Sequence, residues 1–434
     1  MVHQIKGSAT RDWLNLGRIR RQALLLVVVL WLGYALTMAT PGMRDRFGHI
    51  KGADFLHAYV LGTVALEHRG EALYDTRVQR EIAEERVPES AGDYFLPVYG
   101  PQYSLIWAPL ARLPYGWAAA IWMAVSAAIY GACCYAVWRT CPNLRVYGGT
   151  VALLAAAFPG FFALITFGQN SALALACFTG AYFALRARRE VWAGVCLGLL
   201  AYKPQLALVP GFVFAVASLW PGKRVRGSDI ETWPAGTTNL GACKVVLGAM
   251  IAVVAQFPVA YWWYGAGPLV AYAQVLTRLG SAAAILEPRP YLMHSLRAFW
   301  KLLLPWPGVA FLLYLVTALG AVALAIICWQ RPVELERRYA VMLLATVLVA
   351  PHLTVYDLVI LAPALLWVGD GLHTGAANIA WLLYLAYVLP FAGPLTRWTH
   401  VQLSVIGMAA LAVSFGLGFP RARVEQETVT LSAQ

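Results

Sequence analysis

The chain has 434 residues, of which 60% are hydrophobic and only 12% are charged. Ordinary soluble domains carry about 25% charged residues, and one core of this size could not bury so much apolar surface. Soluble, disordered, collagen-like and coiled-coil proteins are therefore excluded. With a mean hydropathy of +0.63, the sequence predicts an all-α polytopic membrane protein.

The net charge of +12 comes from 33 Lys and Arg against 21 Asp and Glu. Because the basic residues stand between apolar runs, we interpret them as topology signals and expect no nucleic acid partner. The seven cysteines show no metal-ligand spacing, so no metal site is predicted.

Apolar runs in chain order predict about twelve transmembrane helices. The runs are residues 22–40, 116–138, 148–166, 170–186, 191–202, 205–220, 242–260, 306–329, 339–352, 357–369, 376–391 and 401–419. Several are too short to cross about 30 Å of hydrocarbon upright, and such helices are tolerated where they line a cavity. The clearest breaks fall at residues 202–205 and 351–357.

The positive-inside rule orients this bundle with the N-terminus in the cytoplasm. The cytoplasmic side then collects Arg18, Arg20, Arg21, Arg139, Arg145, Arg186, Arg188, Arg189, Lys223, Arg224, Arg226, Arg331, Arg337, Arg338, Arg421 and Arg423. The predicted organisation is a cytoplasmic segment (1–21), one transmembrane domain (22–420) and a cytoplasmic tail (421–434). We expect a multi-pass protein of the cytoplasmic (inner) membrane.

Residues 41–115 form a long external loop that holds ten of the 21 acidic residues. Its pattern predicts an amphipathic helix over 53–69, a charged helix over 75–89 and an aromatic, proline-rich turn over 94–102. Residues 105–113 are expected along the membrane interface. A loop of this length is seldom a passive connector, and here it could shield a site from water.

Asp54 stands at the start of the first predicted external helix. One interpretation is a capping carboxylate, which is a common use of Asp at a helix start. The other is a general base, with His57 one turn on and on the same face.

Lys203 precedes a proline between two short apolar runs. A buried cation in a membrane protein indicates function by default, and a phosphate is its commonest anionic ligand. The alternative is a lysine whose head snorkels to the external interface.

Further polar residues cluster on the same predicted side of the membrane. His352, Tyr356 and Asp357 lie at the second break, either as a phosphate or sugar-hydroxyl clamp or as ordinary interfacial residues. Gln169 and Asn170 open the fourth helix, either as a helix start or as amide partners for sugar hydroxyls. The predicted topology brings these residues to one face together with Asp54 and Lys203.

Three stretches together resemble glycosyltransferase family 87, the polyprenyl-phosphomannose-dependent α-mannosyltransferases of the GT-C superfamily. They are Asp54-Phe55 through Leu73-Tyr74-Asp75 with Tyr99-Gly100-Pro101 and residues 108–114; Phe167-Gly168-Gln169-Asn170 with residues 193–204; and Pro351-His352 with Tyr356-Asp357. Order and spacing match over about residues 25–365. The family often has Tyr-Pro-Pro where this chain has Tyr99-Gly100-Pro101.

The resemblance implies a GT-C-type catalytic domain that transfers a sugar without metal or cofactor. The donor would be a polyprenyl-phosphate sugar, and the acceptor a glycolipid or glycan hydroxyl on the extracytoplasmic side, both held among membrane lipids. Mannose is the family expectation, although arabinofuranose or another prenyl-linked sugar stays open. Asp54 occupies the position of the general base in the first external loop.

The other candidate residues then divide between donor and acceptor. Lys203 and His352 are expected on the donor phosphate, where charge develops as it leaves. The residues expected on the sugar or acceptor are His57, Gln169, Asn170, Tyr356 and Asp357.

The main rival is a transporter or flippase of a polyprenyl-linked sugar, since broken helices around a buried cation are also typical of transporters. Transporters usually carry an internal repeat, and the two halves of this sequence show none. A structural protein without catalysis would leave Lys203 and His352 unexplained.

Overall fold

The computed structural model describes residues 15–92, 96–220, 238–278, 290–374 and 377–418. Within these ranges the regular elements are helices, and the only other pairings are two isolated β-bridges. Three predictions lie outside the described residues: the first part of segment 1–21, the loop cations Lys223, Arg224 and Arg226, and the tail 421–434.

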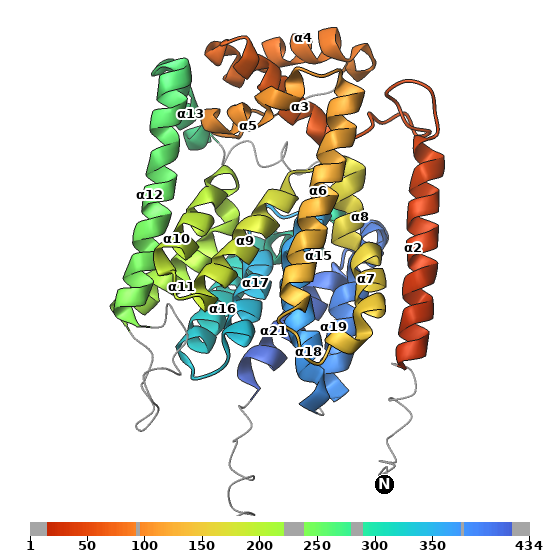
Figure 1. The fold of residues 1–434 in the computed structure, drawn as a ribbon, viewed down its shortest axis with the longest axis vertical. Helices are drawn as coiled ribbons and strands as arrows, with labels where there is room; N and C mark the ends of the chain where they lie inside the picture. The colour runs from red at the N-terminus through yellow and green to blue at the C-terminus, as the bar shows by residue number, and fades with distance from the viewer. Residues whose placement is uncertain (1–14, 93–95, 221–237, 279–289, 375–376, 419–434) are drawn as a thin grey trace, which may run out of the picture.

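Five helices are long and apolar enough to cross a membrane, and these indicate a membrane protein (Figure 1). They are α2 (Leu16–Met38), α6 (Tyr115–Trp138), α12 (Asn239–Tyr264), α16 (Pro307–Gln330) and the run Ile379–Thr399, which joins α19 (Ala377–Val388), η10 (Leu389–Leu395) and α20 (Thr396–Thr399). A sixth span results if α7 (Gly148–Ala157) and α8 (Pro159–Phe167), bent by 48°, count as one. The predicted count of about twelve is not confirmed.

The remaining predicted runs form helices that are too short to span the hydrocarbon alone. They are α9 (Ser171–Arg186), α10 (Glu190–Gly198), η4 (Leu199–Tyr202), η5 (Pro204–Leu206), α11 (Leu208–Leu219), α17 (Leu335–Val349), η8 (Val355–Leu361), α18 (Ala362–Asp370), η9 (Gly371–Thr374) and α21 (Leu403–Leu417). Both predicted breaks are confirmed, between η4 and η5 and between α17 and η8. Pro204 causes the first, because it lacks an N–H and disfavours helical geometry at Lys203, whose φ is −130°.

The predicted external loop and a later segment form a helical cap over one end of the bundle, at the top of Figure 1. Its elements are α3 (Ala53–Leu66), η1 (Gly70–Tyr74), α4 (Thr76–Arg86), η2 (Pro88–Ser90), α5 (Pro101–Ala111) and α13 (Gly267–Arg278). The charged helix over 75–89 is confirmed as α4, which Asp75 caps by accepting from Arg77 N at 2.9 Å.

The prediction of an amphipathic helix over 53–69 is wrong in its burial. Ten of the 14 residues of α3 are buried, so the helix has no solvated face. The cause is α5, which crosses it so closely that a Cβ on Gly62 would lie 2.7 Å from the Trp107 backbone. A helix that is apolar all round belongs in a protein interior, and α3 is accordingly the core of the cap.

At the end of the bundle opposite the cap, polar contacts join the helix ends, several of which carry arginines. Arg186 Nη1 lies 3.1 Å from Glu336 Oε1, and Asn143 N donates to Asp370 Oδ1 at 2.8 Å. The short elements η3 (Arg145–Tyr147), η7 (Pro290–Leu292) and α15 (Leu296–Leu303) complete the described fold. The basic residues at this end stand in short loops and at helix ends, which are the positions that the positive-inside rule counts, whereas the basic residues of the cap stand in a long loop among acidic ones.

Small residues let α10 and α12 pack with their backbones in contact. A Cβ on Gly194 would lie 2.0 Å from Val245 O, and one on Gly248 would lie 2.1 Å from Val191 O. Such glycine contacts are a common way to join helices in membranes, where no hydrophobic effect drives their association. The contact fixes α10, and with it the break that carries Lys203.

Candidate active site

Asp54 lies in the first turn of the cap helix α3 and is half-buried. The helix is capped by Gly52, whose φ is 68°, with no side-chain capping bond, so Asp54 is not the capping residue. Its Oδ2 instead accepts a hydrogen bond from Gln169 Nε2 at 3.0 Å. The negative charge of the carboxylate is also stabilised by the positive end of the helix dipole.

Two glycines bring Gln169 against Asp54. Gly168 ends α8 with a φ of 68°, a conformation that favours glycine. A Cβ there would lie 2.9 Å from Phe55 Cβ and 3.3 Å from Gly52 Cα. This close approach of two backbone turns is possible only without side chains, and it sets the amide beside the carboxylate.

Asn170 links α9 to the aromatic turn before α5. Its Nδ2 donates to Tyr103 OH at 2.5 Å and to Tyr99 OH at 3.3 Å, while its backbone N donates to Gln169 Oε1 at 2.7 Å. The residue is 3% exposed, and its Oδ1 has no hydrogen-bond partner among the described residues. A buried acceptor without a partner is costly unless a ligand or water meets it.

Tyr99 lies near both carboxylates of the cluster. Burial is the main cause that raises the pKa of its phenol to about 12, and the Asp54 and Asp357 carboxylates add to the increase. The hydrogen bond from Asn170 lowers this pKa and offsets part of the increase. The ring of His57 packs at 5.8 Å from that of Tyr99, and burial lowers the pKa of His57 to about 4. Both side chains are therefore neutral at pH 7.

Lys203 forms a buried ion pair with Asp357. Its Nζ lies 2.6 Å from Asp357 Oδ1 and 2.9 Å from Ser171 Oγ, and the two charged residues are 4% and 2% exposed. The ammonium also lies 5.4 Å from the centroid of the Tyr356 ring. Lys203 therefore does not snorkel to an interface but stays inside the bundle.

Asp357 was expected on a sugar or acceptor, yet protein donors fill its acceptor sites. Oδ1 accepts from Lys203 and, at 2.6 Å, from Ser171 Oγ. Oδ2 accepts from Thr354 N and Oγ1, both at 3.2 Å, in a capping box that starts η8. A carboxylate accepts about four hydrogen bonds, so Asp357 positions Lys203 and η8.

His352 lies half-buried in the loop between α17 and η8. Next to this loop, Arg297 Nη1 donates to Pro351 O at 3.3 Å. A second basic side chain, from α15, thus lies against the loop that carries His352.

One short segment connects the two carboxylates. Gln169 bonds Asp54, and Ser171, two residues on, bonds both Lys203 and Asp357. The structure therefore brings Asp54, the amides and the ion pair into one cluster under the cap. Among the described residues, no group of three or more His, Cys, Asp or Glu stands close enough to hold a metal ion.

The sequence analysis missed four residues of this cluster: Ser171, Tyr99, Tyr103 and Thr354. The role of Thr354 could have been predicted from the sequence, since Thr-x-x-Asp before an apolar run is a capping-box pattern. Ser171 directly follows Asn170, but a serine in the first turn of a helix is too common to stand out.

The fold and the cluster define a helical protein with helices long and apolar enough to span a membrane and a polar site between a cap and broken helices. Residues 97–351, more than half of the chain, match the family model of glycosyltransferase family 87. The chain belongs to glycosyltransferase family 87. No curated protein and no solved structure matched it. The matched span includes Gln169, Asn170 and Lys203, whereas Asp54 and His57 precede it and His352 follows it directly.

Proposed function

We propose that this glycosyltransferase moves one sugar, expected to be mannose, from a polyprenyl-phosphate donor to a hydroxyl of a glycolipid or glycan. The observation that carries the proposal is the cluster itself. Gln169 orients the carboxylate of Asp54, and Ser171, two residues further along the chain, holds a buried ammonium. Those are the two groups that a single displacement needs, a base for the acceptor and a cation for the leaving phosphate.

Asp54 acts as the general base in this proposal. The acceptor oxygen forms a bond to the anomeric carbon as the bond from that carbon to the phosphate oxygen breaks. The acceptor proton passes to Asp54, and polyprenyl phosphate leaves with the bonding electron pair. One in-line displacement inverts the anomeric centre, and a phosphate leaving group needs no strong general acid.

Lys203 and His352 stabilise the donor phosphate. Among the described residues, Lys203 donates to two acceptors, which leaves one of its three ammonium protons for a phosphate oxygen. Asp357 neutralises the charge of the Lys203 ammonium when no donor is bound, so the ammonium is held in place without a net buried charge. Cations aimed at the developing charge lower the barrier most where water is excluded.

The sugar and acceptor contact the polar side chains around Asp54. Asn170 Oδ1 is a buried acceptor suited to a sugar hydroxyl. His57, Gln169 and Tyr356 complete this set, with Gln169 also orienting Asp54. The neutral His57 ring adds no charge that would compete with Lys203 for the phosphate.

The cap faces the extracytoplasmic side of the cytoplasmic membrane in this proposal, because the arginine-bearing helix ends lie opposite to it. The donor's prenyl chain then lies along the bundle among membrane lipids. No metal and no cofactor takes part.

The test is sugar transfer by the purified protein in detergent, with a radiolabelled polyprenyl-phosphate mannose and a panel of glycolipid acceptors, with and without EDTA. We expect labelled product that EDTA does not reduce. The buried ion pair between broken helices also fits a flippase of the same donor. A flippase has no work to do in detergent, so absence of product together with lipid translocation in vesicles would favour that rival.

A further inference from the structure

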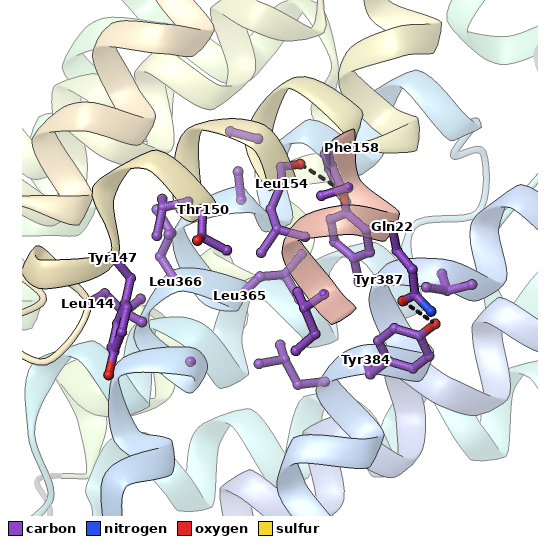
Figure 2. Close-up of a pocket in the computed structure, with 18 of the residues that line it drawn as sticks. Gln22, Leu144, Tyr147, Thr150, Leu154, Phe158, Leu365, Leu366, Tyr384 and Tyr387 are labelled. Carbon is purple, nitrogen blue, oxygen red and sulfur yellow. Dashed lines mark hydrogen bonds between the residues drawn. The ribbon is translucent and has the colours of Figure 1, made fainter. Parts of the chain in front are cut away.

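A cavity of about 880 Å³ lies between α2 and the helices α6, α7, α18 and α19 (Figure 2). Its walls are almost entirely apolar and contain none of the residues of the candidate active site. Figure 2 shows two polar links across it, Tyr384 OH to Gln22 Oε1 at 3.5 Å and Tyr387 OH to Leu154 O at 2.8 Å. An apolar space of this size suits a ligand with hydrocarbon chains.

Aromatic packing separates the cavity from the cap. Just beyond the lining part of α2, Trp31 packs on Phe161 and Phe162 at 5.5 and 5.6 Å between ring centroids. Its Nε1 donates to Ala156 O at 3.0 Å, and Tyr130 stacks on Phe161 at 4.3 Å. These rings fill the space between α2 and α8 beside the cavity.

The other end of the cavity is basic. Its lining begins at Leu16 on α2 and at Leu144 and Tyr147 beside α7. Next to these residues stand four exposed arginines: Arg18, Arg20, Arg21 and Arg145. Basic residues beside a membrane attract anionic lipid headgroups.

We propose that this cavity binds the acyl chains of one anionic phospholipid from the leaflet at the end opposite the cap. The headgroup phosphate meets the arginines, among them Arg20 of α2 and Arg145 of η3. Gln22, Tyr147 and Thr150, which line the cavity, supply donors for the ester oxygens. The lipid fills the space between α2 and the rest of the bundle, since protein buries only 6% of the apolar stretch of α2.

Native mass spectrometry of the detergent-purified protein tests the proposal, with phosphatidylglycerol and phosphatidylcholine added in turn. We expect one retained phospholipid, with phosphatidylglycerol favoured. Ala380→Trp places a large ring in the cavity and should abolish retention. The matched control is Val29→Trp, on an outward part of α2 that is 58% exposed and outside the lining, and it should retain the lipid.

Charge variants give a second measurement that leaves the packing unchanged. Replacing Arg20 and Arg145 by Gln should weaken phosphatidylglycerol binding about fivefold for each charge removed, read from the lipid-dependent rise in melting temperature. Arg77→Gln, in the cap, should leave that rise unchanged. Equal retention of both lipids, retention by Ala380→Trp, or polyprenyl phosphate as the bound lipid would overturn the proposal, whatever the outcome for sugar transfer.

Discussion

Asp54 and Asp357 lie in one cluster, yet their surroundings differ in kind. Asp357 is 2% exposed and receives four hydrogen bonds from Lys203, Ser171 and Thr354. Asp54 is half-buried at the rim of the cap and is oriented by the amide of Gln169. A carboxylate held by four protein donors positions its neighbours, whereas Asp54 stands half-buried in the first turn of a cap helix.

The two surroundings follow from where the chain breaks. Asp357 starts η8 inside the bundle, where a charge persists only if it is paired and hydrogen-bonded. Asp54 lies in the first turn of a cap helix and is only half-buried. The comparison predicts that changes at Asp357 act mainly on stability and changes at Asp54 mainly on activity.

Breaking the buried pair should have the largest effect on stability. Lys203→Ala leaves the Asp357 carboxylate buried without its counter-ion, and such changes cost about 3–5 kcal/mol. Asp357→Ala should cost a similar amount for the same reason. Melting of the purified variants in detergent measures both, and unchanged melting temperatures would contradict the buried pair.

The double variant Lys203→Met with Asp357→Leu sharpens this test. Replacing both charges with apolar residues leaves no uncompensated buried charge, so the loss of stability should be smaller than that of either single variant. Donor binding should still be lost, because no ammonium remains for the phosphate. Normal donor affinity in the double variant would remove Lys203 from the donor site.

Gln169→Ala should lower kcat about 10- to 100-fold, because a hydrogen bond to a charged group contributes about 1.5–3 kcal/mol. The carboxylate of Asp54 would lose a donor that favours its charged form, so the acidic limb of the pH–kcat profile should move to higher pH. A purely structural role of Gln169 predicts the same loss with an unmoved profile. Gln169→Glu, which keeps the size but places a second carboxylate beside Asp54, should move the limb further.

Gly168→Ala should destabilise the protein by about 1–2 kcal/mol through its left-handed conformation alone. Contact with Phe55 Cβ, 2.9 Å from the added carbon, should also push α3 away from α8. Because α3 carries Asp54, sugar transfer should fall further than the loss of folded protein alone would explain. The matched control is Gly149→Ala, where no atom lies within 4 Å of the added carbon.

His57 should add stability at neutral pH that is lost in acid. Burial lowers its pKa from 6.5 to about 4, so the folded protein resists a proton that the unfolded chain accepts. Its contribution to stability is therefore complete above pH 6.5 and is lost as the pH falls towards 4. Melting temperatures of wild type and His57→Gln across this range should converge at low pH.

Local signals in the sequence predict much of this architecture. Proline at 204 and the polar run at 351–357 mark breaks because their effect on a helix is local. The charged helix α4 and its Asp75 cap are likewise readable from neighbouring residues. The burial of α3 is not, since it depends on α5, which lies some forty positions further along the chain.

The pairing inside the site could not be predicted for the same reason. Lys203 and Asp357 are 154 positions apart, and their bond depends on how α9, α10 and α17 pack. The sequence marked both residues as polar groups at helix breaks, which is a local property. It could not show that one neutralises the other, or that Ser171 bridges them.

The central claim is that Asp54 takes the acceptor proton. The most direct measurement is the rate of sugar transfer by Asp54→Asn, beside Asp75→Asn, which removes a charge from the same loop while asparagine preserves the cap of α4. The account predicts a loss of about 10²- to 10⁴-fold for Asp54→Asn, with an unchanged melting temperature and near-normal transfer by the control. A near-normal rate for Asp54→Asn would contradict it.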